Sequence, residues 1–105
     1  MVENLADATT DNIDEFKGLD QCVAVFHKKL CPHCKILMKV IAKVEAKVPG
    51  VTFIAIDSEE EPGLMERYGV ERVPTLVCMK NGHGVAKKAG VMNPKEMLSF
   101  IGSSY

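Results

Sequence analysis

The chain has 105 residues, which suits one domain, and we expect residues 1–105 to form a single one. Its 13 basic and 14 acidic residues give a formal net charge of -1, which argues against nucleic acid as the main partner, because phosphate binding needs a clustered basic excess. The first twenty residues are rich in acidic side chains, and no segment is apolar enough to cross a bilayer. We therefore expect neither a signal peptide nor a membrane partner.

Short apolar runs alternate with helical patterns along the chain, as expected of an α/β domain. A short strand is expected near residues 2–5 and a weak helix at about 11–17. Residues 31–48 carry apolar side chains at helical spacing, with Pro32 at the first helical position and Pro49 after the last turn. Three runs rich in β-branched or bulky apolar side chains are predicted to form buried strands: residues 22–26, 51–56 and 75–79.

The second half of the chain continues this alternation. Residues 62–68 favour a helix, and the Asn-Gly pair at 81–82 predicts a tight turn with residues 85–89 as the hairpin partner of the third buried strand. Asn93, followed by Pro94 and Glu96, has the pattern of a helix cap, so a last helix is expected from there. Together these elements predict an α/β fold with a central mixed β-sheet of four or five strands flanked by four α-helices.

Cys31 and Cys34 enclose Pro32 and His33, directly after a predicted strand and at the start of a predicted helix. Cys31 falls at the cap position, where unpaired backbone N–H groups and the helix dipole favour a negatively charged sulfur. Because the thiolate is the reactive form, Cys31 is the predicted nucleophile. Cys34, about one turn further on, is placed to attack the resulting mixed disulfide and release the reduced substrate. His33 is placed to donate a hydrogen bond or positive charge to the thiolate, which would make the disulfide a stronger oxidant.

Two other interpretations of this motif stay open. A second Cys-x-x-Cys pair that would complete a zinc cage is missing, but Cys31, His33 and Cys34 form an alternative metal-binding set. A redox-inactive binding module is the third interpretation, and the intact cysteine pair disfavours it. We expect a cytoplasmic protein, and in that compartment four cysteines favour catalysis or metal binding over a structural disulfide framework.

Several further residues are interpreted as structural. Cys22 and Cys78 lie in predicted strands and are expected to be small buried apolar residues. We expect His27 to be partly exposed and His83 to face solvent in a turn. Four lysines recur every fourth residue on the helix predicted over 31–48, and we interpret them as a solvated helix face: Lys35, Lys39, Lys43 and Lys47.

Several residues and short motifs follow one another along the chain: Phe26, Cys31-Pro32-His33-Cys34-Lys35, Asp57, Tyr68-Gly69-Val70, Val73-Pro74-Thr75-Leu76, Lys80-Asn81-Gly82 and Gly90. In this combination the sequence resembles the thioredoxin family over essentially its whole length. The resemblance implies the thioredoxin fold, exchange with protein disulfides, a flavin-containing, NADPH-dependent thioredoxin reductase as electron donor, and no cofactor or metal beyond the Cys31–Cys34 disulfide. We expect the protein to be a monomer.

The resemblance further implies that Pro74 is a cis-proline facing the cysteine pair, although on sequence alone an ordinary trans bond is favoured. It assigns substrate binding to the residues around that proline and before the motif. With Pro32 and Pro74, these are Leu30, Val73, Gly90 and Val91.

The departures from the family pattern predict an unusual redox poise. Leu30 stands where the family usually has Trp, and Pro32-His33 resembles the pair of periplasmic dithiol oxidases of the DsbA type. The family's buried Asp would fall at Val25 and its Lys neighbour at Phe53, so the usual proton acceptor for Cys34 is missing. We therefore expect a protein-disulfide oxidoreductase that is more oxidising than a typical thioredoxin. The nearest alternative is a glutaredoxin-like, glutathione-coupled enzyme, since those also use Cys-Pro-x-Cys.

Overall fold

The computed structural model describes residues 6–7, 9, 12–16 and 21–105. Within them the chain forms, in order, β1 (Ala6–Asp7), the 3-10 helix η1 (Ile13–Phe16), β2 (Cys22–His27), α1 (Pro32–Glu45), β3 (Thr52–Asp57), α2 (Pro62–Arg67), β4 (Thr75–Lys80), β5 (His83–Ala89) and α3 (Pro94–Ser104).

The five strands form one mixed sheet in the order β1-β3-β2-β4-β5. β1 and β2 both run parallel to β3, whereas β4 is antiparallel to β2 and to β5. A parallel pair needs a crossover connection, and α1 supplies it between β2 and β3. β2 therefore occupies the centre of the sheet, and its first five residues are all buried.

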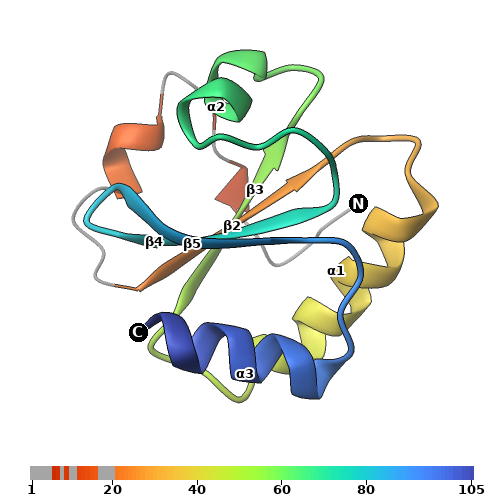
Figure 1. Ribbon diagram of the computed structural model, residues 1–105, viewed down its shortest axis with the longest axis vertical. Helices are drawn as coiled ribbons and strands as arrows, with labels where there is room; N and C mark the ends of the chain where they lie inside the picture. Colours follow the sequence, from red (N-terminus) through yellow and green to blue (C-terminus); the bar gives the residue numbers. More distant parts are fainter. Residues whose placement is uncertain (1–5, 8, 10–11, 17–20) are drawn as a thin grey trace.

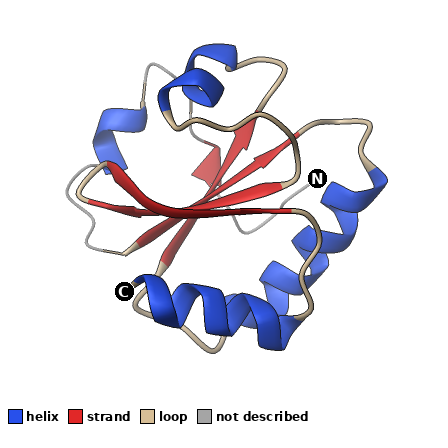
Figure 2. Ribbon diagram, in the orientation of Figure 1, coloured by secondary structure: helices blue, strands red, loops and turns tan. Residues whose placement is uncertain are grey.

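Helices cover both faces of this sheet (Figures 1 and 2). Alternate residues of β2 face opposite sides, because successive strand side chains point to opposite faces. Val23 and Val25 join a core with residues of α1 and α3, while Ala24 and Phe26 join a second core with residues of η1 and α2. The result is a three-layer arrangement with α1 and α3 on one face and η1 and α2 on the other.

The strands and helices predicted from residue 22 onward are confirmed, with bounds that shift by a few residues at most. The α-helix expected at about 11–17 is wrong, since the described part of that segment is only the single 3-10 turn η1. Thr9 and Asn12 explain this: their side chains accept each other's backbone N–H groups (2.7 and 3.3 Å), which competes with helix hydrogen bonds. Three α-helices, rather than four, thus flank the sheet in the described residues. The strand expected at 2–5 lies outside them, and the described edge strand is β1.

The predicted cap of the last helix is confirmed. The Asn93 side chain accepts the Glu96 backbone N–H (2.8 Å), and the Glu96 carboxylate accepts the Asn93 N–H (3.3 Å), so the two residues form a capping box. None of the helices described here is long and apolar enough to span a membrane.

Candidate active site

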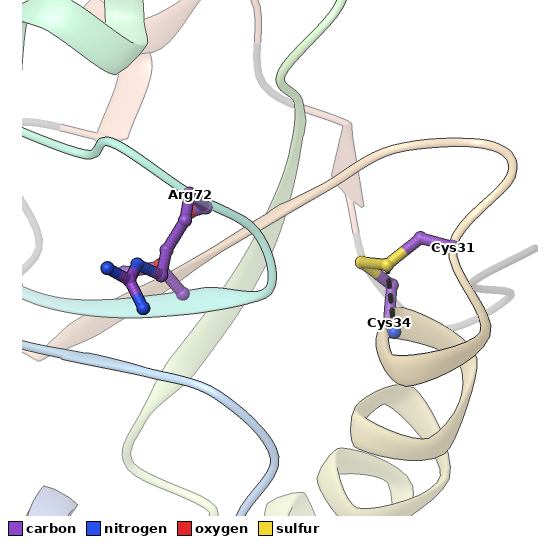
Figure 3. The surroundings of a disulfide bond; sticks show 4 residues. Cys31, Cys34 and Arg72 are labelled. Carbon is purple, nitrogen blue, oxygen red and sulfur yellow. Dashed lines mark hydrogen bonds between the residues drawn. A yellow bond between two sulfur atoms is a disulfide. The ribbon is translucent and has the colours of Figure 1, made fainter.

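Cys31 is the N-cap of α1, at the end of the loop that leaves the centre of the sheet. Its backbone is extended (φ -138°, ψ 101°), and Pro32 opens the helix with a φ that suits the first position. The Cys31 sulfur accepts the backbone N–H of Cys34 at 3.2 Å. The two cysteines are joined by a disulfide with a Cα–Cα distance of 5.2 Å (Figure 3). The predicted cap position of Cys31 is therefore confirmed.

The disulfide itself is largely buried, but the residues next to the two cysteines in the sequence are exposed. We call these residues, Leu30, Pro32 and His33, the rim of the site. Cys31 and Cys34 are 6% and 3% exposed, whereas Leu30 is 89% exposed and the side chains of Pro32 and His33 also face solvent. The two buried sulfur atoms are therefore accompanied by exposed apolar side chains and by the exposed imidazole of His33. The large exposed fraction of Leu30 leaves its apolar side chain accessible just before the motif. Its contact with a substrate stays a prediction.

The Val73–Pro74 peptide bond is cis, as the resemblance implied. Thr75 pairs with Phe26 across β4 and β2, so Pro74 lies at the end of the sheet from which the loop to Cys31 departs. Pro74 is buried and its carbonyl accepts the backbone N–H of Gly90 at 2.9 Å. Residues 73–74 and 90 are thereby held together at this end of the molecule.

The residues expected to bind substrate differ in accessibility. Val73 and Gly90 are half-buried, while Val91 is 43% exposed. Gly90 has a φ of +94°, a conformation that an L-residue rarely adopts, so the turn into Val91 depends on glycine. Contact of these residues with a substrate stays a prediction.

Sequence reasoning did not single out Arg72, which precedes the cis peptide. Its carbonyl accepts the Thr75 hydroxyl at 2.7 Å, which fixes the turn that presents Val73. The Arg72 side chain is exposed and points away from the disulfide (Figure 3). The Thr-Leu start of β4 was visible in the sequence, but the hydrogen bond back to Arg72 depends on the turn and not on a local pattern.

The core beneath α1 lacks an ionisable pair. Val25 is fully buried and Phe53 is 5% exposed, and both belong to the same apolar core as Leu37, one turn after Cys34. The thiol of Cys78 is the only titratable side chain among the buried members of that core within the described residues. Val25 and Phe53, the positions to which the resemblance assigns an Asp and a Lys, thus contribute apolar side chains to this core.

The other two cysteines carry free, buried thiols, as predicted. Burial raises the pKa of Cys22 to about 11. It also raises the pKa of Cys78, although hydrogen bonds from Ser104 and Tyr105 partly oppose the effect. Cys22 and Cys78 belong to the cores on opposite faces of the sheet, so they are not partners for each other.

The remaining sequence interpretations concern histidines and lysines. His27 is half-buried and His83 is exposed, as expected, although His83 begins β5 and does not lie in the turn. All four lysines of the predicted helical stripe are exposed. In the part of the chain that the structure describes, no three His, Cys, Asp or Glu side chains are grouped to hold a metal ion, so the alternative metal site at Cys31, His33 and Cys34 gains no support.

Comparison with known proteins gives a consistent result. The family model described as Thioredoxin matches residues 5–103. The chain is 30% identical to a thioredoxin of Rickettsia typhi over 106 residues, which covers 99% of each protein. It is 30% identical to a thioredoxin of Chlamydia trachomatis over 76 residues, or 72% of this chain and 74% of the relative. The solution structure of reduced desulfothioredoxin from Desulfovibrio vulgaris Hildenborough is similar with a TM-score of 0.82 and 39% identity, covering 98% and 99% of the two chains.

Proposed function

This chain belongs to the thioredoxin family and is a protein-disulfide oxidoreductase, and we propose that Cys31–Cys34 is its redox centre, with a couple more oxidising than that of a typical thioredoxin. One observation carries the proposal: Cys31 is the N-cap of α1 and its sulfur accepts the Cys34 backbone N–H. The same N–H would hydrogen-bond a Cys31 thiolate after reduction.

The exchange reaction transfers two electrons between the cysteine pair and the substrate disulfide. In the reducing direction, the Cys31 thiolate attacks one sulfur of a substrate disulfide, which forms a mixed disulfide and expels the other substrate sulfur as a thiolate. The Cys34 thiolate then attacks the Cys31 sulfur. This step forms the Cys31–Cys34 disulfide and releases the second substrate sulfur as a thiolate. The substrate is reduced by two electrons and the enzyme is oxidised by two, and the oxidising direction is the reverse.

The oxidising poise follows from what stabilises the dithiol form. Helix N-terminal N–H groups and the dipole of α1 favour a thiolate at Cys31, and we assign the exposed side chain of the neighbouring His33 the role of a further donor. Stabilising the thiolate stabilises the reduced state and makes the disulfide a stronger oxidant. The apolar residues Val25 and Phe53 supply no base for Cys34, so its proton leaves through His33 or water.

Substrate binding is proposed at the rim of the site together with the residues around the cis peptide. Pro32 and Leu30 form one side, and the cis peptide before Pro74 forms the other with Val73. Gly90 and Val91 complete this surface. An extended segment of a protein substrate would lie between the two sides, with its disulfide above Cys31.

Members of this family act on protein disulfides and are reduced by thioredoxin reductase. We propose a flavin-containing, NADPH-dependent reductase for this chain and the cytoplasm as its location. The free thiols of Cys22 and Cys78 suit a reducing compartment. Fractionation with an antibody to the native protein, together with NADPH consumption in the presence of the reductase, tests both statements.

The reduction potential of the Cys31–Cys34 couple tests the poise. The protein is equilibrated with glutathione redox buffers, and alkylation is measured on the peptide that contains both residues, so that Cys22 and Cys78 do not distort the balance. We expect a potential at least about 30 mV less negative than the roughly -270 mV of thioredoxin. His33→Ala should move it toward the thioredoxin value and raise the pKa of Cys31. A wild-type potential equal to that of thioredoxin would refute the oxidising poise and leave the exchange chemistry intact.

A further inference from the structure

The exposed side of α1 carries one sign of charge. Lys35 follows Cys34 directly, and Lys39 and Lys43 repeat it one and two turns further along. All three side chains are exposed. We call these three residues the α1 basic face. Because Lys35 follows Cys34, this face begins beside the disulfide and continues along α1; Figure 1 shows the course of that helix.

This face is not neutralised by its own helix. No Asp or Glu stands three or four residues from Lys35, Lys39 or Lys43, and residues 21–44 contain no acidic residue at all. Like charges four residues apart destabilise a helix, whereas opposite charges at this spacing would stabilise it. The helix therefore keeps an unfavourable charge pattern where its surface adjoins the reactive centre.

The surroundings of the α1 basic face are mixed. Lys28 and Lys29 extend it with two further exposed positive charges in the loop before Cys31. Leu30 and Ile36, which are 89% and 49% exposed, lie among these lysines in the sequence. Because this surface begins beside the disulfide, and members of the family act on protein disulfides, a protein substrate is the partner that it would meet.

The turn that follows β3, at the same end of the sheet, carries the opposite charge. His27, the last residue of β2, pairs with Asp57 of β3, and the His27 carbonyl accepts the Ser58 N–H at 2.7 Å. The exposed residues Glu59 and Glu60 follow directly, so acidic side chains border the β2 end on its β3 side. The active-site end is thus polarised, with positive charge over α1 and negative charge over the turn after β3.

We infer that the α1 basic face docks an acidic segment of a partner protein whose disulfide exchanges with Cys31–Cys34, an inference that rests on the proposed function. Charge complementarity raises the association rate and fixes the orientation of the partner. With a rise of about 1.5 Å per residue, Lys43 lies about 13 Å along the helix from Cys34. The partner's acidic residues therefore lie within about that distance of its reacting disulfide, on one side only.

The test uses two synthetic peptides with the same intramolecular disulfide, one flanked by four Glu residues and one by four Lys residues. The second-order rate constant for their reduction by the full chain is measured at about 0.01 M and about 1 M salt, where the Debye length is about 30 Å and about 3 Å. We expect the acidic peptide to react about tenfold faster at low salt. The difference should disappear at high salt.

Charge variants locate the effect on α1. Lys39→Glu/Lys43→Glu leaves the residues next to the cysteines unchanged and should abolish or invert the low-salt preference. The matched control is Lys47→Glu/Lys80→Glu. It changes the net charge equally but farther from the cysteines, since Lys47 follows the end of α1 and Lys80 ends β4, whose Met79 pairs with Cys22 at the start of β2. This control should keep the preference. Lys39→Gln/Lys43→Gln, which preserves helix propensity, should reduce it by about half on a logarithmic scale.

Three outcomes would overturn the inference. The first is equal rates for both peptides at low salt. The second is an equal loss of preference in the test and control variants, which would mean that net charge alone acts. The third is binding of an RNA oligonucleotide or an anionic phosphatidylserine vesicle that depends on Lys39 and Lys43 while the peptide rates do not. Reduction of an uncharged disulfide peptide at about 1 M salt separates the two proposals, because failure there contradicts the exchange function and not the docking.

Discussion

Val25→Asp tests whether the core beneath α1 is as apolar as the structure shows. Val25 is fully buried in the centre of β2, with Ala55 and Leu76 as its neighbours on the flanking strands. The substitution restores the acidic residue typical of the family but not its Lys neighbour, because Phe53 stays in place. The introduced carboxyl then lies among apolar side chains without a cationic partner.

The expected cost follows from burial. Removing a fully buried Val side chain from the core loses about 1.5–3 kcal/mol. Burying a carboxyl without hydrogen-bond partners adds about 1–3 kcal/mol even when the group is protonated. The free energy of unfolding should therefore fall by about 3–6 kcal/mol, a large part of the roughly 5–15 kcal/mol typical of a domain.

The pH dependence identifies the carboxyl as the cause. Burial raises its pKa in the folded state above the value of about 3.9 in the unfolded chain, so the folded state binds more protons over this range. Stability then falls as pH rises, by up to about 1.4 kcal/mol for each pH unit until the folded-state pKa is reached. Val25→Ala, which loses volume but gains no charge, should show a smaller and pH-independent loss.

Urea unfolding of the wild type and both variants at pH 4, 5, 6 and 7 measures these differences. A Val25→Asp loss that stays constant between pH 5 and 7 and equals that of Val25→Ala would refute the reasoning, because the carboxyl would then have found water or a partner. In the same variant, release of a chromogenic thiol from a mixed disulfide at Cys31 should be faster than in the wild type if the missing proton acceptor limits that step.

Two further predictions concern stability outside the active site. The Tyr105 hydroxyl lies within 2.8 and 2.9 Å of the Cys22 and Met79 carbonyls, so Tyr105→Phe should lower the free energy of unfolding by about 1–2 kcal/mol in urea titration, and an unchanged midpoint would contradict this role. Burial raises the pKa of Cys22 from its ordinary 9.0 to about 11, so this thiol contributes stability that is complete below pH 9 and is lost as pH rises to 11. Unfolding followed over this range should show a loss on the order of 2 kcal/mol that Cys22→Ala reduces, and an identical pH profile in that variant would contradict the assignment.

The elements around the site were predictable because each has a local signal. Pro32, the apolar spacing that follows it and the preceding β-branched strand define the start of α1 and place Cys31 at its cap. The Asn93 capping box was also readable from four residues. The segment at 13–16 was not, since a single turn is too short for a periodicity that would distinguish a 3-10 turn from an α-helix.

Contacts between distant segments were beyond local patterns. The hydrogen bond from Gly90 to Pro74 joins two loops, and the contact of Tyr105 with the Cys22 carbonyl joins residues 83 positions apart. The cis state of the Val73–Pro74 bond was predictable only through the family resemblance, because cis forms are a minority of X–Pro bonds. The burial of Cys31 to 6% likewise depends on neighbours from several elements.

The apolar residues Val25 and Phe53 and the lysines of α1 all concern the electrostatic environment at the start of α1. Apolar residues at positions 25 and 53 remove ionisable groups from the core, so the charges that influence the cysteines lie on the surface at the start of α1. Surface charges respond to salt and to a bound partner, whereas a buried carboxylate is shielded from both. An acidic partner docked on the α1 basic face would weaken the positive field at Cys31 and make its thiolate less favourable. The proposed docking would therefore couple partner binding to redox poise through α1, and we expect that coupling to weaken as salt screens the lysines.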